Sequence, residues 1–165
     1  MEKRNKIAAY NLMLAQAEVL FAKESNPIAN LSNASALIKT TLPDSVFSGF
    51  YLTTQENELI LGPFQGNVSC VHIHYGKGVC GEAAQKQETL IVDDVTKHQN
   101  YIACDSAAKS EIVVPMIKDN KVIGVLDLDS SNVADYDEID KEYLEKLVYL
   151  LMNKTIFHYQ MFELE

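Results

Sequence analysis

Hydrophobic and polar positions at the start of the chain follow the period of a helix. Within residues 5–24, apolar side chains recur at spacings of three or four along one face: Tyr10, Leu14, Ala17 and Phe21. This spacing predicts an amphipathic helix that packs on a core or a partner. A Ser-Asn-Pro sequence at residues 25–27 ends it, and a second helix is expected over residues 31–41, stopped before Pro43.

The middle of the chain alternates short apolar runs with polar ones, which is typical of strands and turns. Strands are expected over residues 46–53, 58–61, 69–75, 89–92, 111–117 and 122–129. The polar residues 54–57 and 118–121 each join two such runs, so two hairpins and an antiparallel sheet are predicted. Residues 62–66 are expected to form a turn-rich link, and a short helix is expected over residues 82–87.

A long helix is predicted near the end of the chain, from about residue 136 towards residue 157. Asp135 and Glu138 have the spacing of a capping box, and four residues are expected to line the apolar face of this helix: Ile139, Leu144, Leu147 and Leu151. Helices at both ends with an antiparallel sheet between them define an α+β fold. The 165 residues are expected to form one domain, because no linker or repeat interrupts them.

The balance of charges argues against several classes of partner. The chain has 14 Lys and Arg residues against 23 Asp and Glu residues, a net charge of −9. It therefore lacks the positive field that draws proteins to nucleic acid or anionic lipid. No apolar run approaches the roughly 20 residues of a membrane span. Three cysteines are too few for a secreted disulfide framework, so reducing cytoplasm is the expected location.

Three carboxylates are the most informative polar residues. In the predicted strand 122–129, alternation places Asp127 and Asp129 on one face and the neighbouring leucines on the other. Glu111 opens the adjacent strand of the same hairpin, so it could join them. A solvent-facing strand edge would give the same pattern. If instead the face is buried, such a cluster repels itself, raises at least one pKa, and binds a cation or holds a proton for chemistry.

The three cysteines suggest a redox relay, in which one thiolate attacks and another resolves. Cys70 in a strand reads as a small buried hydrophobe, whereas Cys80 in a glycine loop and Cys104 in the long loop 93–109 are poor core candidates. Two rivals remain open. A cysteine hydrolase could use His98 as its base, and a structural zinc site could draw its ligands from two cysteines and two histidines: Cys70, His72, His74 and Cys80.

Residues 76–81 fit the G-x-G-x-x-G pattern of dinucleotide-binding loops. That site also needs a full crossover helix and a parallel strand, and here the helix is short and the sheet antiparallel. The glycines are therefore expected to shape a tight turn that presents Cys80.

Read together, these segments resemble the GAF-domain free methionine-(R)-sulfoxide reductases. The resemblance runs from the first helix to the last, with all three cysteines of the family in order. It rests on five segments: Leu61-Gly62-Pro63-Phe64-Gln65-Gly66, Gly76-Lys77-Gly78-Val79-Cys80-Gly81, the stretch from His98 to Asp105, Ser110-Glu111-Ile112-Val113, and the run from Ile123 to Ser130. It implies a six-stranded antiparallel sheet flanked by helices, and a homodimer packed through the terminal helices.

The resemblance also implies roles for single residues. Cys104 matches the catalytic cysteine, and Cys70 and Cys80 match the other two redox cysteines. The substrate-binding carboxylates of the family match three acids: Glu111, Asp127 and Asp129. Phe47 stands where the family more often has Trp, with Tyr51 after it, so a smaller aromatic wall is expected against the sulfoxide methyl group. Thioredoxin is the implied reductant, and no bound cofactor or metal is implied.

The reduction of a sulfoxide gives a reason for a cluster of carboxylic acids at the site. The sulfoxide oxygen must be protonated as sulfur is attacked, and a carboxylic acid kept neutral by like-charged neighbours can supply the proton. Glu111 with Asp127 or Asp129 is expected to do so, while the remaining charge holds the substrate ammonium group. Cys104 then becomes a sulfenic acid and forms a disulfide with Cys70 or Cys80. The rival from another class is a non-enzymatic GAF module that binds a small ligand.

Overall fold

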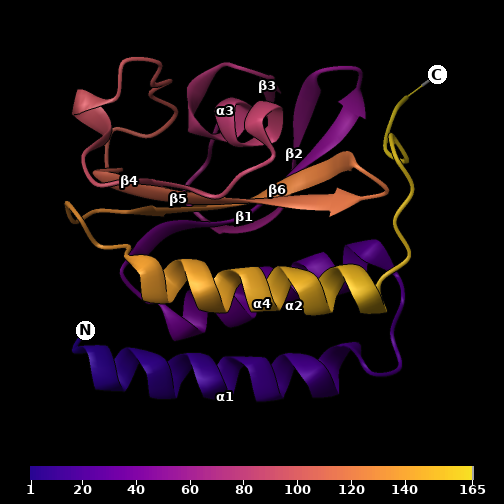
Figure 1. Ribbon diagram of the computed structural model, residues 1–165, viewed down its shortest axis with the longest axis horizontal. Helices are drawn as coiled ribbons and strands as arrows, with labels where there is room; N and C mark the ends of the chain where they lie inside the picture. Colours follow the sequence, from indigo (N-terminus) through magenta and orange to yellow (C-terminus); the bar gives the residue numbers. More distant parts are fainter. Residues whose placement is uncertain (165) are drawn as a thin grey trace.

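A six-stranded antiparallel sheet runs through the middle of the molecule (Figure 1). The structure is a computed structural model, and it describes residues 1–164. The strand order is β3-β2-β1-β6-β5-β4, so the long strands β1 and β6 lie at the centre. The strands are β1 (Ser45–Gln55), β2 (Glu58–Gly66), β3 (His72–His74), β4 (Leu90–Val92), β5 (Ser110–Lys118) and β6 (Lys121–Ser130). The predicted α+β class and both predicted hairpins are confirmed.

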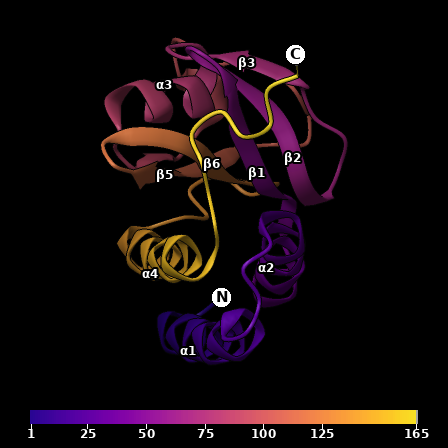
Figure 2. The same cartoon turned by 90° about the vertical axis from the view of Figure 1, so that its right-hand side faces the viewer.

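Helices cover the two faces of the sheet unequally (Figures 1 and 2). One face is covered by α2 (Pro27–Thr41) and α4 (Glu138–Lys154), and α1 (Lys3–Phe21) packs against both of them as an outer layer. The other face carries the short helix α3 (Gly78–Lys86) and the loop that contains the 3-10 turn η1 (Val95–Lys97). No helix within residues 1–164 has the length and apolar character needed to cross a membrane.

Strand alternation divides the interior into two cores. Leu126 and Leu128 of β6 point into the larger core, which α1, α2 and α4 close. The alternate positions Asp127 and Asp129 therefore face α3, beside a smaller apolar core built on β1, β5 and α3. Both aspartates are buried, so the interpretation of this face as a solvent-facing edge is wrong.

Two predicted turns belong to regular elements. Residues 62–66 continue β2 instead of forming a link, because β1 and β2 pair on both sides of a bulge that accommodates Pro63. The glycine pattern at residues 76–81 runs into the first turn of α3. A Cβ at Gly81 would lie 2.3 Å from the carbonyl oxygen of His74, so this glycine lets the helix pack on β3. Cys80 is consequently a buried helical residue, and its prediction as a loop thiol is wrong.

The capping box of α4 is formed by Asp137 and Asp140, two residues beyond the predicted pair. The predicted cap, Asp135, instead accepts a hydrogen bond from the Ser130 hydroxyl. Asp140 is fully buried and also accepts hydrogen bonds from Lys6 and Tyr10 of α1. The cap therefore fixes the outer helix as well as starting α4.

Candidate active site

The predicted site residues surround a small cavity between the sheet, α3 and the loop before β5. Its volume is about 30 Å³, measured as the space open to the centre of a water molecule, which is enough for one or two waters. Six of the eight predicted site residues line it: Tyr51, Cys80, Cys104, Glu111, Asp127 and Asp129. Cys70 is bonded to Cys104, while Phe47 lies outside the lining.

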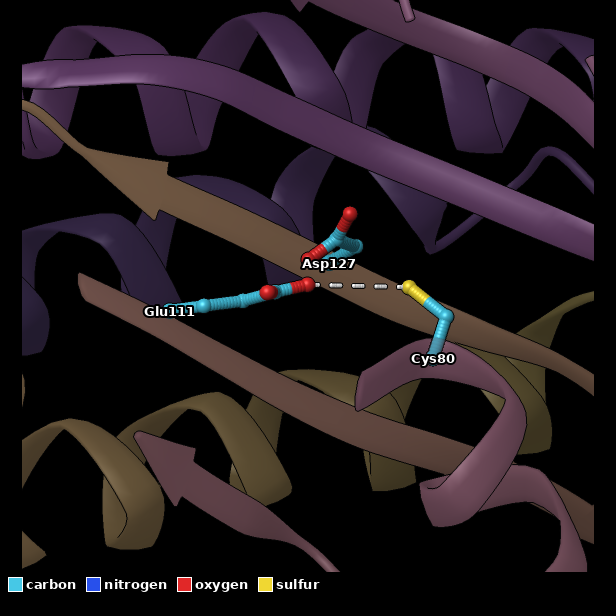
Figure 3. Close-up of side chains that lie close together, drawn as sticks. All are labelled: Cys80, Glu111 and Asp127. Atoms are coloured by element: carbon cyan, nitrogen blue, oxygen red, sulfur yellow. Dashed lines mark hydrogen bonds between the residues drawn. The ribbon is translucent and has the colours of Figure 1, made fainter. Parts of the chain in front are cut away.

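The three carboxylates come together because of the register of the central strands. Glu111 of β5 is the cross-strand partner of Asp129 of β6, and Asp127 lies two residues before Asp129 on the same face. All three side chains are buried. Figure 3 shows Glu111 extending from its strand towards Cys80 on α3, with Asp127 of the neighbouring strand beside the end of Glu111.

Burial and mutual repulsion change the acidity of this group. Burial raises the pKa of Glu111 well above that of an ordinary glutamic acid, and the charges of Asp127 and Asp129 raise it further. Burial raises the pKa of Asp127 to about 6, and burial followed by the charge of Asp127 raises the pKa of Asp129. The cluster therefore holds protons at a pH where exposed carboxyls have lost theirs.

Cys80 is a protonated hydrogen-bond donor at the base of the cavity. Its Sγ lies 3.8 Å from Glu111 Oε1 (Figure 3). Burial raises the pKa of the Cys80 thiol, and the charges of Asp127 and Glu111 raise it further. A thiol with such a pKa is a poor nucleophile, because thiolate is the reactive form.

The same cluster could receive a cation or a donor group from a ligand. One ligand atom each from Cys80, Glu111 and Asp127 lies within 4.8 Å of the others. Asp127 Oδ1 is buried and has no hydrogen-bond partner among residues 1–164. The zinc set considered from the sequence does not assemble, because Cys70 is bonded to Cys104 and His72 hydrogen-bonds Glu58 at the surface.

A disulfide joins Cys70 and Cys104, whose Cα atoms are 5.3 Å apart although 34 residues separate them in sequence. Cys70 lies between β2 and β3, and Cys104 lies in the loop before β5. Two polar contacts support this crossing. The Tyr51 hydroxyl donates to the Cys70 carbonyl oxygen at 2.8 Å, and Asn67 Nδ2 donates to Asp105 Oδ2 at 2.8 Å. Cys80 is the free cysteine.

Aromatic residues form one wall of the site. Tyr51 lines the cavity, and Phe47 stacks behind it, with ring centroids 6.1 Å apart. Phe64 also stacks on Phe47, with ring centroids 5.1 Å apart. Tyr101 also lines the cavity and was missed from the sequence. Its position as an aromatic residue in a polar loop, three residues before Cys104, was the available signal.

His98 does not act on Cys104 in this structure. Its Nε2 is hydrogen-bonded to Glu82 Oε2 of α3, and this bond ties the loop of Cys104 to the helix of Cys80. The cysteine hydrolase interpretation required His98 beside a free Cys104 thiol, and neither condition is met.

This chain is similar to known proteins over most of its length. A family model described as GAF domain matches residues 33–153. A free methionine-R-sulfoxide reductase of Saccharomyces cerevisiae is 48% identical to this chain, covering 93% of it and 89% of the yeast protein. GAF domain-containing protein A of Dictyostelium discoideum is 47% identical and covers 93% of this chain and 96% of its own length.

The chain is also similar in structure to a solved protein. The X-ray structure of free methionine-R-sulfoxide reductase from Neisseria meningitidis, in complex with its substrate, superposes with a TM-score of 0.87. The two sequences are 44% identical, over 90% of this chain and 89% of the other. The chain therefore belongs to the GAF domain family and, within it, to the free methionine-R-sulfoxide reductases.

Proposed function

We propose that this protein reduces free methionine-(R)-sulfoxide to methionine, with Cys104 as the nucleophile and Cys70 as the resolving thiol. The observation that carries the proposal is the Cys70–Cys104 disulfide at the edge of a cavity walled by buried carboxyl groups. The names of the relatives and the substrate complex of the Neisseria protein support the choice of substrate.

The carboxylates provide two functions that a free amino-acid sulfoxide requires. One buried acid that keeps its proton can donate it to the sulfoxide oxygen, and the raised pKa of Glu111 supports this role. A deprotonated neighbour can hold the substrate ammonium group, and the unpaired Asp127 Oδ1 supports that second role. A residue within a peptide has no free ammonium group at this position, so the cluster favours the free amino acid.

The cavity of the disulfide form is too small for a ligand with ten non-hydrogen atoms. The loop that carries Cys104 closes it from one side, with Tyr101 and Ile102 among the lining residues. We therefore assign substrate binding to the reduced form, in which the loop is not bonded to Cys70. Disulfide formation then follows product release or accompanies it.

The reaction balances in two steps. The Cys104 thiolate attacks the sulfoxide sulfur while the oxygen takes a proton from the acid cluster. The hydroxyl group formed on the substrate then passes to Cys104 Sγ, as the transient bond between the two sulfur atoms and the original sulfur–oxygen bond break. Methionine leaves, and Cys104 becomes a sulfenic acid. The Cys70 thiol then attacks Cys104 Sγ and expels the oxygen as water, which leaves the disulfide. Cys80 keeps its proton and positions Glu111 through the hydrogen bond described above.

A disulfide that forms at each turnover requires a reductant, and we propose thioredoxin in the cytoplasm, with no bound cofactor. We also propose that residues 1–165 act as one GAF domain and pair as a homodimer through the terminal helices. The exposed apolar side chains of Leu12 and Val19 on α1 support that interface.

A coupled assay tests the function. Thioredoxin, thioredoxin reductase and NADPH are combined with the protein and with free methionine-(R)-sulfoxide, its (S) epimer or a peptide sulfoxide, each in its own reaction. We expect NADPH oxidation with the free (R) epimer, and its loss in Cys104→Ser. No oxidation with any substrate, in protein shown to have reduced thiols, would contradict the proposal and favour a ligand-binding module.

A further inference from the structure

The disulfide is bordered by exposed apolar side chains on both of the segments that it joins. Val68 and Val71 flank Cys70 and are 83% and 53% exposed, and Ile102, two residues before Cys104, is 40% exposed. Consecutive Cα atoms are 3.8 Å apart, so each of these residues starts within about 8 Å of a disulfide Cα. Single exposed apolar residues are ordinary, but here three of them lie within two residues of the two bonded cysteines.

We infer that these three residues form a docking surface for a protein dithiol, whose thiolate attacks Cys70 rather than Cys104. This inference rests on the proposed function, because a reductase that ends its cycle as a disulfide needs a thiol donor. Val68, Val71 and Ile102 together constitute this docking surface.

The charge distribution favours an apolar contact at this place. Residues 65–71 carry no charged side chain, although the whole chain has a net charge of −9. The nearest carboxylate in sequence on the opposite segment, Asp105, accepts a hydrogen bond from Asn67. The docking surface and its neighbours within residues 65–71 are therefore uncharged, which favours an apolar contact over an ionic one.

The direction of attack follows from the cavity. Thiol–disulfide exchange proceeds by attack of a thiolate on one sulfur, and the other sulfur leaves. The attacking atom comes in line with the bond, from the side opposite the leaving sulfur. Cys104 lines the cavity, where only about 30 Å³ is open among Cys80 and the acids, so a protein thiolate has little room on that side of its sulfur. Cys70 does not line the cavity and is flanked in sequence by the exposed Val68 and Val71, so we assign the attack to its sulfur.

The exchange transfers two electrons from the partner dithiol to the Cys70–Cys104 disulfide. The first partner thiolate bonds to Cys70 Sγ, and the Cys70–Cys104 bond breaks with its electron pair moving to Cys104 Sγ. The Cys104 sulfur is released beside the acid cluster, which can supply its proton. The second partner thiolate then attacks the partner sulfur of the mixed disulfide and releases Cys70. The partner dithiol is oxidised to a disulfide, and both cysteines of this chain are reduced.

A trapping reaction tests which sulfur is attacked. The disulfide form of the protein is mixed with thioredoxin whose second active-site cysteine is replaced by serine, so that the mixed disulfide persists. Peptide mapping by mass spectrometry then identifies the linked cysteine. We expect Cys70, whereas linkage through Cys104 would overturn the inference. Because this reaction requires only the disulfide, it tests the docking even if the protein reduces no sulfoxide.

Kinetics with two reductants test the surface itself. Val68→Glu and Val71→Glu are expected to raise the KM for thioredoxin about tenfold, while turnover supported by dithiothreitol stays within about twofold because a small thiol needs no docking surface. Ile28→Glu is the matched control, since Ile28 is 50% exposed on α2, on the opposite face of the sheet from α3. An unchanged KM for thioredoxin in both variants would overturn the docking surface. Lack of turnover with dithiothreitol in the unsubstituted protein would instead contradict the proposed function.

Discussion

Glu111 and Asp129 are direct cross-strand partners, and both side chains are buried on the same face of the sheet. Like charges opposite each other on neighbouring strands destabilise a sheet, and Asp127 adds a third acid to the pair. The pKa values of all three are raised, with burial as the largest cause. This arrangement is unfavourable for folding when ionised, and it supplies the proton that we assign to the sulfoxide oxygen.

The free energy of unfolding should therefore fall as pH rises. Groups with raised pKa values bind more protons in the folded protein than in the unfolded one, so stability is greatest below about pH 4 for these groups and is lost as pH rises through their folded pKa values. Asp127→Asn removes one charge and should stabilise the protein by about 1–2 kcal/mol at pH 8. Urea unfolding at pH 8 and pH 5 measures this, with a smaller gain expected at pH 5. Equal stability of the two proteins at both pH values would contradict the assigned repulsion.

The protonated acid should also control the chemical step. Glu111→Gln is expected to lower the rate of methionine formation by about 10²–10⁴-fold. Single-turnover reactions of the reduced protein should slow as pH rises through the raised pKa values of the cluster, since the acid form is then depleted. Methionine released per mole of protein is the measurement. A rate that rises steadily from pH 6 to pH 9 would assign the proton to another donor.

The two cysteines other than Cys104 should behave differently. Cys80→Ala should still form the Cys70–Cys104 disulfide after one turnover, because its sulfur is not part of that bond. Its single-turnover rate should fall, since Glu111 loses its hydrogen-bond donor. Cys70→Ser should release methionine once and leave Cys104 as a sulfenic acid that dimedone labels. Mass spectrometry of the digested proteins distinguishes the two, and a Cys80–Cys104 disulfide in the unsubstituted protein would contradict this assignment.

The ion pair between the outer helix and α4 should matter for stability and not for chemistry. Lys6 Nζ lies 2.6 Å from Asp140 Oδ2, and the Tyr10 hydroxyl lies 2.6 Å from Oδ1. Asp140→Ala removes the buried carboxylate beside Lys6 Nζ, leaves only the more distant Asp137 at 3.9 Å as an ion-pair partner, and should cost about 3–5 kcal/mol. Replacing Lys6 by Met together with Asp140 by Leu should restore part of this loss. Urea unfolding checks both variants, and an Asp140→Ala protein as stable as the unsubstituted chain would contradict the prediction.

The sequence was sufficient for the two hairpins and for the shared face of the acids, although it left open whether that face is buried. Period-two alternation placed Asp127 and Asp129 on one face, and that face is the cavity wall because β5 and β6 pair as a hairpin. Strand alternation and hairpin pairing each involve residues close together in the sequence, so both could be predicted from residue spacing alone. The cross-strand position of Glu111 followed from the same hairpin.

Other features depend on contacts between distant parts of the chain. Cys80 is helical because Gly81 allows α3 to approach β3 closely, and no local propensity encodes that approach. Pro63 stays within a strand because a bulge accommodates it. Asp137 caps α4 with Asp140, whose carboxylate also binds Lys6 more than a hundred residues away. Cys104 is bonded to Cys70 and not to Cys80 because of the path taken by the loop that carries Cys104, and spacing along the sequence does not give that path.

The small volume of the cavity has a consequence for the order of events at each turnover. A protein whose site is closed by its own disulfide cannot hold a second sulfoxide until a reductant has opened that bond. The two half-reactions are then separated in time, and double-reciprocal plots against sulfoxide at several thioredoxin concentrations should be parallel. The supply of reduced thioredoxin, rather than the affinity for the sulfoxide, would limit how fast the protein repairs methionine when oxidant is abundant.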